Sequence, residues 1–355
     1  MTIKTKNLRT ILTAGALAGL AACGGSSQTD QEKVASAMQT SMKGDLTTLW
    51  MASQMLKAAA PMPSGRGWDA TMDAAAISSM KDAWKMARQA YEHVEGATAP
   101  IFSDIDVEID ERYDGFLANS GPDDYLFDDM GVTGMHAIER ILYVDTTPAN
   151  VVQFEMTLPG YKAAAFPATE QEASDFKNKL CARLVTNTKQ LLDGWTTAAK
   201  LDVSGAFDGL ISLVNEQQEK INNASLNVEE SRYSQRTLAD LRDNLAGTTT
   251  IYGLFRDWLE TKPASGGTAA GTDIDASITA GLSGLGADYD AIQGDALPKP
   301  PATWSAEAPT TADLATPFGQ LYSQVHAAVD PSKADSIVSQ MNDGAKLLGI
   351  DTFQP

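Results

Sequence analysis

The feature that most limits the fold of this 355-residue chain is the long run of segments in which apolar residues recur at every third or fourth position. This spacing places apolar side chains along one side of an α-helix. Alternating apolar and polar runs, and the clusters of β-branched and aromatic residues typical of strands, are scarce. The sequence therefore predicts an all-α protein. Helices are expected over roughly residues 31–60, 69–98, 130–145, 169–200, 205–224, 234–260, 273–293, 311–329 and 332–348.

Helices of this length with short connections pack as up-and-down bundles. We expect two bundle-like lobes, roughly residues 34–200 and 201–355. Segments 261–272 and 297–309 are rich in Gly and Ala or in Pro, and are expected to be surface connections. Residues 100–130 are acidic and interrupted by glycine and proline, so this stretch is expected to be irregular.

The first residues resemble a bacterial lipoprotein signal. Basic residues precede a short apolar segment, which ends in Leu20-Ala21-Ala22-Cys23. The apolar segment is too short to cross a bilayer, so it is interpreted as an export signal. We assign the signal peptide and its lipobox to residues 1–23, a flexible tether to 24–33 and the helical domain to 34–355.

The resemblance to lipoprotein signals implies cleavage before Cys23 and acylation of its thiol. Gly24 stands where an inner-membrane retention signal tends to have Asp. An anchor on the periplasmic side, with the outer membrane favoured, is therefore expected. An ordinary secretory signal with a chance cysteine is the alternative. With Cys23 acylated, Cys181 is the only remaining cysteine, which leaves no disulfide and no thiolate metal cluster.

The chain is strongly acidic. Its formal net charge is −19, and loss of Lys4, Lys6 and Arg9 with the signal makes it −22. Such a surface repels phosphate backbones, so nucleic acid is not expected as a partner. The same charge attracts cations, although many exported proteins are acidic only for solubility.

Polar side chains interrupt the apolar face of two predicted helices. Within residues 73–96, Arg88 and Glu95 lie on the apolar face. In residues 134–142, His136 and Glu139 are three positions apart and share the buried face. Burying an unpaired charge costs several kcal/mol, so these groups must be paired, neutralised or bound to a metal. Arg88 and Glu95 pairing with each other or across the bundle is the structural alternative.

Common hydrolase signatures are missing from the sequence. There is no H-E-x-x-H motif, and the inverted motif H-x-x-E-H would need a histidine where Arg140 stands. A G-x-S-x-G motif, a P-loop and a dinucleotide-binding glycine pattern are also absent. Of the other histidines, His93 is expected to face solvent or to support the site, and His326 to be structural.

Several motifs, in order, resemble the imelysin family and in particular its EfeO/EfeM-type branch. The similarity runs from about residue 35 to 260. The motifs are A-R-x-x-Y-E-x-x-E at 87–95, D-I-D-V-E-I-D-E-R at 104–112, G-M-H-A-I-E-R-I-L at 134–142, K-I-N-N at 220–223, E-E-S-R-Y-S-Q-R-T-L-A-D-L at 229–241 and N-L-A-G at 244–247.

This resemblance implies an imelysin-like helical fold, an extracytoplasmic location and a role in iron acquisition. It also implies a metal site. Carried over by motif, the ligands are Glu95, Asp110, His136 and Glu139. Arg88, Tyr91 and Asp106 are expected around them, and Asp106 is an alternative to Asp110 as ligand. Carboxylates with one imidazole suit iron, while zinc, copper and manganese are also compatible.

We therefore expect a lipid-anchored monomer that captures iron outside the cytoplasm and passes it to an inner-membrane permease. The main alternative is an imelysin-type metallopeptidase in which Glu95 or Glu139 is the base. Binding of an acidic polysaccharide is disfavoured by the negative charge. The plainest alternative is a buried hydrogen-bond network that holds the lobes together and binds no metal.

Overall fold

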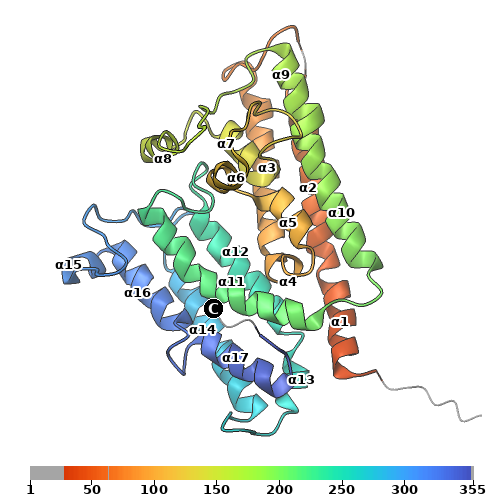
Figure 1. Ribbon diagram of the computed structural model, residues 1–355, viewed down its shortest axis with the longest axis vertical. Coiled ribbons are helices and arrows are strands. Elements are labelled where there is room, and N and C mark those ends of the chain that lie inside the picture. Colours follow the sequence, from red (N-terminus) through yellow and green to blue (C-terminus); the bar gives the residue numbers. More distant parts are fainter. Residues whose placement is uncertain (1–27, 63, 353–355) are drawn as a thin grey trace, which may run out of the picture.

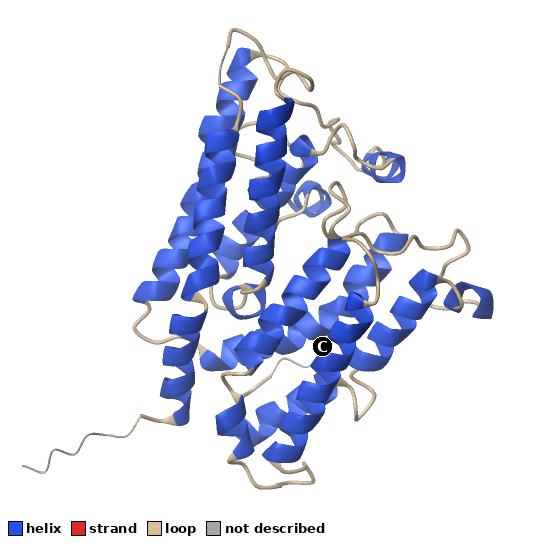
Figure 2. Cartoon of the chain, turned by 180° about the vertical axis from the view of Figure 1, so that it is seen from behind, coloured by secondary structure: helices blue, strands red, loops and turns tan. Residues whose placement is uncertain are grey.

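The computed structural model describes residues 28–62 and 64–352, and within these ranges every regular element is a helix (Figures 1 and 2). The all-α prediction is confirmed. None of the described helices is both long and apolar enough to span a bilayer. The expected signal peptide, with Cys23, and residues 24–27 of the tether lie outside the described residues. The last four residues of the expected tether, 30–33, form the first turn of α1.

The first group of helices is built around three long ones, α2, α3 and α10 (Figure 1). Both α3 and α10 pack against α2. Shorter helices cover this bundle and connect its parts. The group comprises α1 (Asp30–Ser41), α2 (Lys43–Ala59), α3 (Ala74–Glu92), α4 (Glu95–Thr98), α5 (Ser103–Asp110), α6 (Tyr113–Ser120), α7 (Gly134–Leu142), α8 (Ala149–Glu155), α9 (Glu170–Asp175) and α10 (Cys181–Thr197), with a π-helical turn, Phe176–Leu180, between the last two.

The second group packs beside the lower end of the first (Figure 1). Its helices α16 and α17 pack against each other and on both α11 and α14, and α12 also packs on α11 and α14. The group comprises α11 (Val203–Ser225), α12 (Thr237–Tyr252), α13 (Arg256–Glu260), α14 (Gly271–Asp290), α15 (Thr311–Leu314), α16 (Pro317–Val329) and α17 (Ile337–Leu348). The chain crosses between the groups at residues 198–202; the domain boundaries assigned from the sequence remain predictions.

Several predicted helices are divided in the structure. The helix expected at 69–98 begins at Ala74 and ends at Glu92, and α4 follows after a break at His93 and Val94. The acidic stretch 100–130, expected to be irregular, contains α5 and α6. The break after Glu92 changes the direction of every side chain beyond it, which matters for the site described below.

The two groups share one core and touch through their backbones. Buried apolar side chains form a continuous cluster from Val34 to Ile350. A Cβ atom added at Gly209 of α11 would lie 2.0 Å from the carbonyl oxygen of Gly96 in α4. A Cβ atom at Gly247 of α12 would lie 2.3 Å from the carbonyl oxygen of His93. Such close approach is possible only for glycine, so these contacts fix the spacing of the two groups.

Candidate metal centre

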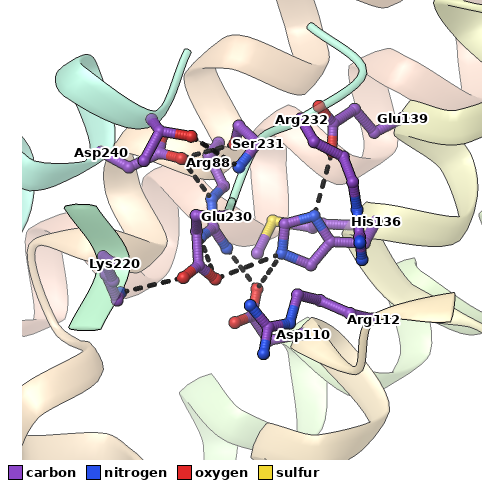
Figure 3. Close-up of polar contacts among 12 residues, drawn as sticks. Arg88, Asp110, Arg112, His136, Glu139, Lys220, Glu230, Ser231, Arg232 and Asp240 are labelled. Atoms are coloured by element: carbon purple, nitrogen blue, oxygen red, sulfur yellow. Dashed lines mark hydrogen bonds and ion pairs between the residues drawn. The ribbon is translucent and has the colours of Figure 1, made fainter. Parts of the chain in front are cut away.

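A cluster of buried charged side chains lies where the two groups meet (Figure 3). Helices α3, α5 and α7 of the first group supply one side of it. Helices α11 and α12 and the connecting segment 226–236 of the second group supply the other. Its central members are the buried Arg88, His136, Glu139, Lys220, Glu230 and Asp240 and the partly buried Asp110.

A glycine places the histidine beside the end of α5. Gly134, the first residue of α7, has a φ of +83°, in the region that favours glycine. A Cβ atom there would lie 2.3 Å from the carbonyl oxygen of Ile109. The start of α7 therefore packs directly on the last turn of α5, and His136 comes to lie next to Asp110.

His136 is 1% exposed and is oriented by Glu139. Its Nδ1 lies 3.0 Å from Glu139 Oε2, and the backbone N–H of Ser234 donates to Glu139 Oε1 at 2.8 Å. Because an ionised carboxylate only accepts hydrogen bonds, Nδ1 carries a proton. The other ring nitrogen, Nε2, is therefore directed to the centre of the cluster.

Two carboxylates face Nε2 of His136. Asp110 Oδ1 lies at 3.4 Å and Glu230 Oε1 at 3.5 Å. Within the described chain, Nε2 has no hydrogen-bond partner of acceptable geometry. One ligand atom from each of these three residues lies within 4.8 Å of the other two. Asp110, His136 and Glu230 are called the triad below.

Two basic side chains hold the triad carboxylates. Arg88 contacts Asp110 through Nη1, and its Nη2 lies 3.1 Å from Glu230 Oε1. Its guanidinium also pairs with Glu92 and lies 3.6 Å from Asp240. The second base, Lys220, has its Nζ 3.4 Å from Glu230 Oε2, and both are buried.

The charge states follow from burial and from these contacts. Burial disfavours the carboxylate of Asp110, but the charges of Arg88 and His136 hold its pKa below the usual value. Burial acts likewise on Glu230, where Lys220 keeps the pKa well below the usual value. Burial opposes the imidazolium of His136, yet Asp110 outweighs it and raises the pKa of His136 to about 10. In the protein alone, His136 is thus a cation at neutral pH.

The pKa values of the remaining acids of the cluster are shifted mainly by burial. Desolvation raises the pKa of Asp240 to about 6 and raises that of Glu92 well above its usual value. Arg88 remains charged, because the surrounding carboxylates outweigh its burial and raise its pKa further. The negative charge of the cluster is thus balanced by three buried cations, Arg88, His136 and Lys220. Partial protonation of the acids reduces it further.

Of the four ligands that the sequence predicts, two belong to the triad. They are Asp110 and His136; Asp110, rather than Asp106, is the aspartate beside the histidine. Glu139 contacts the imidazole from the far side. Glu95 accepts a hydrogen bond from Asn244 Nδ2 at 2.8 Å and lies 3.7 Å from Lys220. Neither Glu95 nor Glu139 converges with the triad, and their roles as ligands remain predictions.

The three residues expected around the site differ in what they do. Arg88 binds triad carboxylates directly. Tyr91 donates to Asp106 Oδ1 at 2.6 Å, and this pair lies to one side. Burial raises the pKa of Asp106 to about 7. Arg88 and Glu95 do not pair with each other, because the helix ends at Glu92 and Arg88 pairs with that residue one turn away. The other form of this alternative, pairing across the bundle, is confirmed: Arg88 pairs with Glu230 and Glu95 with Lys220.

Sequence reasoning missed Glu230 as a member of the site. It lies in the segment 226–236, between α11 and α12, where no helical period shows which side chains point inward. The two adjacent acids of the E-E-S-R-Y-S motif were the available signal. In the structure Glu230 is 7% exposed, whereas Glu229 is only partly buried and accepts from Gln235 at 3.0 Å.

A second cluster of buried ions fixes that segment in place. Arg140 of α7 donates to both oxygens of Glu155 in α8, with Nε at 3.1 Å and Nη2 at 2.9 Å. Tyr233 donates to the same carboxylate. Arg232 pairs with Asp114 of α6. These bonds attach the segment carrying Glu230 to α6, α7 and α8, so the triad is held by both groups.

A pocket of about 260 Å³ leads from the surface to the triad. Asp110 and Glu230 are among its lining residues, together with Glu95, Arg112, Glu216 and Lys220. Glu219 also lines it and is exposed to solvent. An ion in solution therefore has a route to two of the three triad residues without unfolding of either group.

The described chain is thus an all-helical protein of two packed groups, with a histidine and carboxylates gathered between them. Residues 18–318 match the Imelysin family model, and the chain belongs to this family. The predicted resemblance is thereby confirmed. The chain is 25% identical over 264 residues to an "Efem/EfeO family lipoprotein" of Staphylococcus haemolyticus (strain JCSC1435), an alignment that covers 72% of this chain and 78% of that relative.

A solved structure supports the fold. An iron-regulated protein A precursor from Parabacteroides distasonis ATCC 8503 matches with a TM-score of 0.53 and 13% identity, covering 92% of this chain and 97% of the other. At this level of identity the comparison establishes the fold alone. It confirms the imelysin-like helical architecture expected from the sequence.

Proposed function

We propose that this protein captures a metal cation, with iron as the expected cargo, outside the cytoplasm and delivers it to a membrane permease. Asp110, His136 and Glu230 are the proposed ligands. The observation that carries the proposal is His136 Nε2, a buried nitrogen without a hydrogen-bond partner in the described chain that faces two ionised carboxylates. A buried polar atom of this kind is costly unless a ligand satisfies it.

The donor set fits iron. One imidazole nitrogen and two carboxylate oxygens are ligands that first-row divalent metals accept, and zinc, copper and manganese remain compatible. Glu139 supplies what a metal-binding histidine ordinarily needs, a carboxylate on the other ring nitrogen. A cation also offsets the buried negative charge that Arg88 and Lys220 now balance. Glu95, on the pocket wall, is an additional proposed ligand.

The relatives support the choice of cargo and location. The staphylococcal relative is named as a lipoprotein of the EfeM/EfeO family, and the solved structure as an iron-regulated protein. We extend this to an anchor at Cys23, a place on the periplasmic side with the outer membrane favoured, and a monomeric state. Delivery to an inner-membrane iron permease is part of the same proposal.

Metal analysis of two histidine variants tests the proposal. Purified wild type is titrated with Fe²⁺ under anaerobic conditions, beside His136→Ala and the matched control His326→Ala. The control histidine is exposed, on α16. We expect one tightly bound equivalent in the wild type and the control, and loss of binding with retained helicity in His136→Ala. Equal binding by His136→Ala overturns the proposal.

Two other outcomes identify the alternatives. If the wild type binds no metal tightly and His136→Ala only lowers the melting temperature, the cluster is a structural network. Cleavage of casein and insulin by the metal-loaded wild type, lost in His136→Ala, identifies a metallopeptidase instead.

A further inference from the structure

We propose that Lys220 controls access to the triad: its ammonium is a resident cation at the inner end of the pocket, and an incoming metal ion displaces it. This inference rests on the proposed metal capture. It assigns to Lys220 the role of a positioning residue that sets the rate of exchange and the affinity for the metal.

The contacts of Lys220 place its charge between the pocket wall and the triad. Nζ lies 3.7 Å from Glu95 Oε2 on the wall and 3.4 Å from Glu230 Oε2 in the triad. It also donates to Asn244 Oδ1 at 3.1 Å. The other oxygen of Glu230, Oε1, is the one that faces His136. Lys220 and the metal site thus share one carboxylate (Figure 3).

The same helix supplies the outer wall of the pocket. Glu216 and Glu219 lie within one turn of Lys220 on α11, and both line the pocket. Exposure falls along this route: Glu219 is exposed, Glu216 is partly buried and Lys220 is buried. Acidic side chains at the mouth raise the local concentration of cations. Lys220 and Glu230 lie in contact at the buried end of this route, so a cation that reaches Glu230 also meets the ammonium.

The two helical groups are held too rigidly to move apart and admit the ion. The triad takes ligands from both groups, and their separation is fixed by backbone contacts at Gly209 and Gly247. Packed interiors of this kind resist gradual deformation. A lysine side chain, in contrast, is a compact charge on a flexible four-carbon stem. The side chain of Lys220 is therefore the part that moves.

Displacement of a resident cation has two measurable consequences. The ammonium stabilises the metal-free site, because it pairs with Glu95 and Glu230. It also repels a bound metal ion nearby, which weakens binding and favours release. Removing the charge should give a protein that is less stable without metal, yet binds metal more tightly.

Lys220→Met tests this with a side chain of similar length and no charge, and Lys189→Met is the matched control. Lys189, on α10, pairs with the exposed Asp193 and lies 5.3 Å from the centre of the Trp50 ring, so the fluorescence of this control is compared with and without metal. The probe is Fe²⁺ under anaerobic conditions, with Zn²⁺ as a second, redox-inert ion. Binding and release are followed by stopped-flow tryptophan fluorescence. Trp84 donates to the carbonyl oxygen of Met135, next to His136, and reports on the site.

For Lys220→Met we expect affinity at least about tenfold higher than in the wild type, slower release, a lower melting temperature without metal and a larger rise on adding metal. The control should match the wild type. Unchanged affinity and rates in Lys220→Met, with wild-type binding that is lost in His136→Ala, overturn the role of Lys220 and leave metal capture standing. Absence of binding in wild type and Lys220→Met alike overturns both proposals.

Glu219→Gln keeps the inference testable if Lys220→Met does not fold. Glu219 is exposed, so the fold should be unaffected by this change. We expect slower association and a weaker dependence of the association rate on salt concentration. An association rate equal to that of the wild type at low salt contradicts the proposed route.

Discussion

Glu139 holds the Nδ1 nitrogen of His136 at 3.0 Å and thereby directs Nε2 of the same ring to Asp110 and Glu230. The two residues lie three apart on α7, so the orientation is set within one helical turn. The Ser234 N–H holds the other oxygen of Glu139. The polar pair on the buried face of α7 therefore fixes the orientation of the His136 ring.

Glu139→Gln should weaken metal binding while the fold is kept. An amide can still accept the hydrogen bond from Ser234, but it no longer raises the basicity of the imidazole. Loss of such a partner typically lowers metal affinity by about 10- to 100-fold. Isothermal titration with Fe²⁺ or Zn²⁺ measures the change, and circular dichroism checks the fold. An affinity equal to that of the wild type would show that Glu139 does not support the ligand.

Glu230→Gln should remove most of the metal affinity, whereas Glu229→Gln should not. The two glutamates are adjacent, but only Glu230 reaches Nε2 of His136. Glu229 instead accepts from Gln235 on the other side of the segment. The pair is therefore a matched test of Glu230 as a proposed ligand, the triad residue that sequence reasoning missed. Equilibrium dialysis against labelled metal gives the affinities; equal losses in both variants would point to a general disturbance of the segment.

Metal binding should release a proton near neutral pH. Asp110 and the other acidic contacts raise the pKa of His136 to about 10, so the ring is charged before the metal arrives and must be neutral to bind it. The apparent affinity should rise about tenfold per pH unit between pH 6 and 9. Titration calorimetry in buffers of different ionisation enthalpy counts the proton. An affinity independent of pH would exclude His136 as a ligand.

The helical class and two of the three triad residues, Asp110 and His136, could be predicted from the sequence for clear physical reasons. Apolar spacing is a property of each helix by itself, and α7 is short enough for His136 and Glu139 to be placed correctly on its buried face. The apolar period of the predicted helix puts Glu95 on the same face as Arg88 only if the helix continues to that residue, and α3 ends before it. Because the helix stops at Glu92, the carboxylate that pairs with Arg88 is Glu92, and Glu95 points to the pocket.

Glu230 could not be predicted from the sequence for a different reason. It lies between two helices in a segment flanked by Asn227 and Gln235, both with positive φ. Such backbone has no period from which an inward direction can be deduced. Its position is fixed by distant partners, among them Arg88 and the Arg140–Glu155 pair, which only the folded chain brings together.

Asp106→Asn should stabilise the metal-free protein at neutral pH. Burial raises the pKa of Asp106 to about 7, so the folded state holds the proton more tightly than the unfolded state, whose carboxyl has the usual value near 4. The wild type therefore loses stability as the pH rises from about 4 to about 7, by up to about 1.4 kcal/mol per unit. Asparagine keeps an acceptor for Tyr91 and avoids this loss.

Thermal unfolding of wild type and Asp106→Asn across this range provides the measurement. The difference in melting temperature should be small at pH 4, increase up to pH 7 and stay constant above it. A difference that does not change with pH would show that Asp106 remains ionised in the fold.

Gly209→Ala should destabilise the protein and weaken metal binding together, because one contact sets both. The added methyl would meet the backbone of Gly96 at 2.0 Å and force the two helical groups apart, at a cost of about 1–3 kcal/mol or more. Asp110 and His136 lie in one group and Glu230 in the other, so the separation also spreads the triad. Gly284→Ala is the control. Gly284 lies at an exposed position within α14 with open space around it, so the alanine should stabilise the protein by about 0.5–1 kcal/mol.

Urea unfolding and metal titration of both variants test whether the spacing of the two groups sets both stability and metal binding. A Gly209→Ala protein that loses stability but binds metal as the wild type does would contradict this.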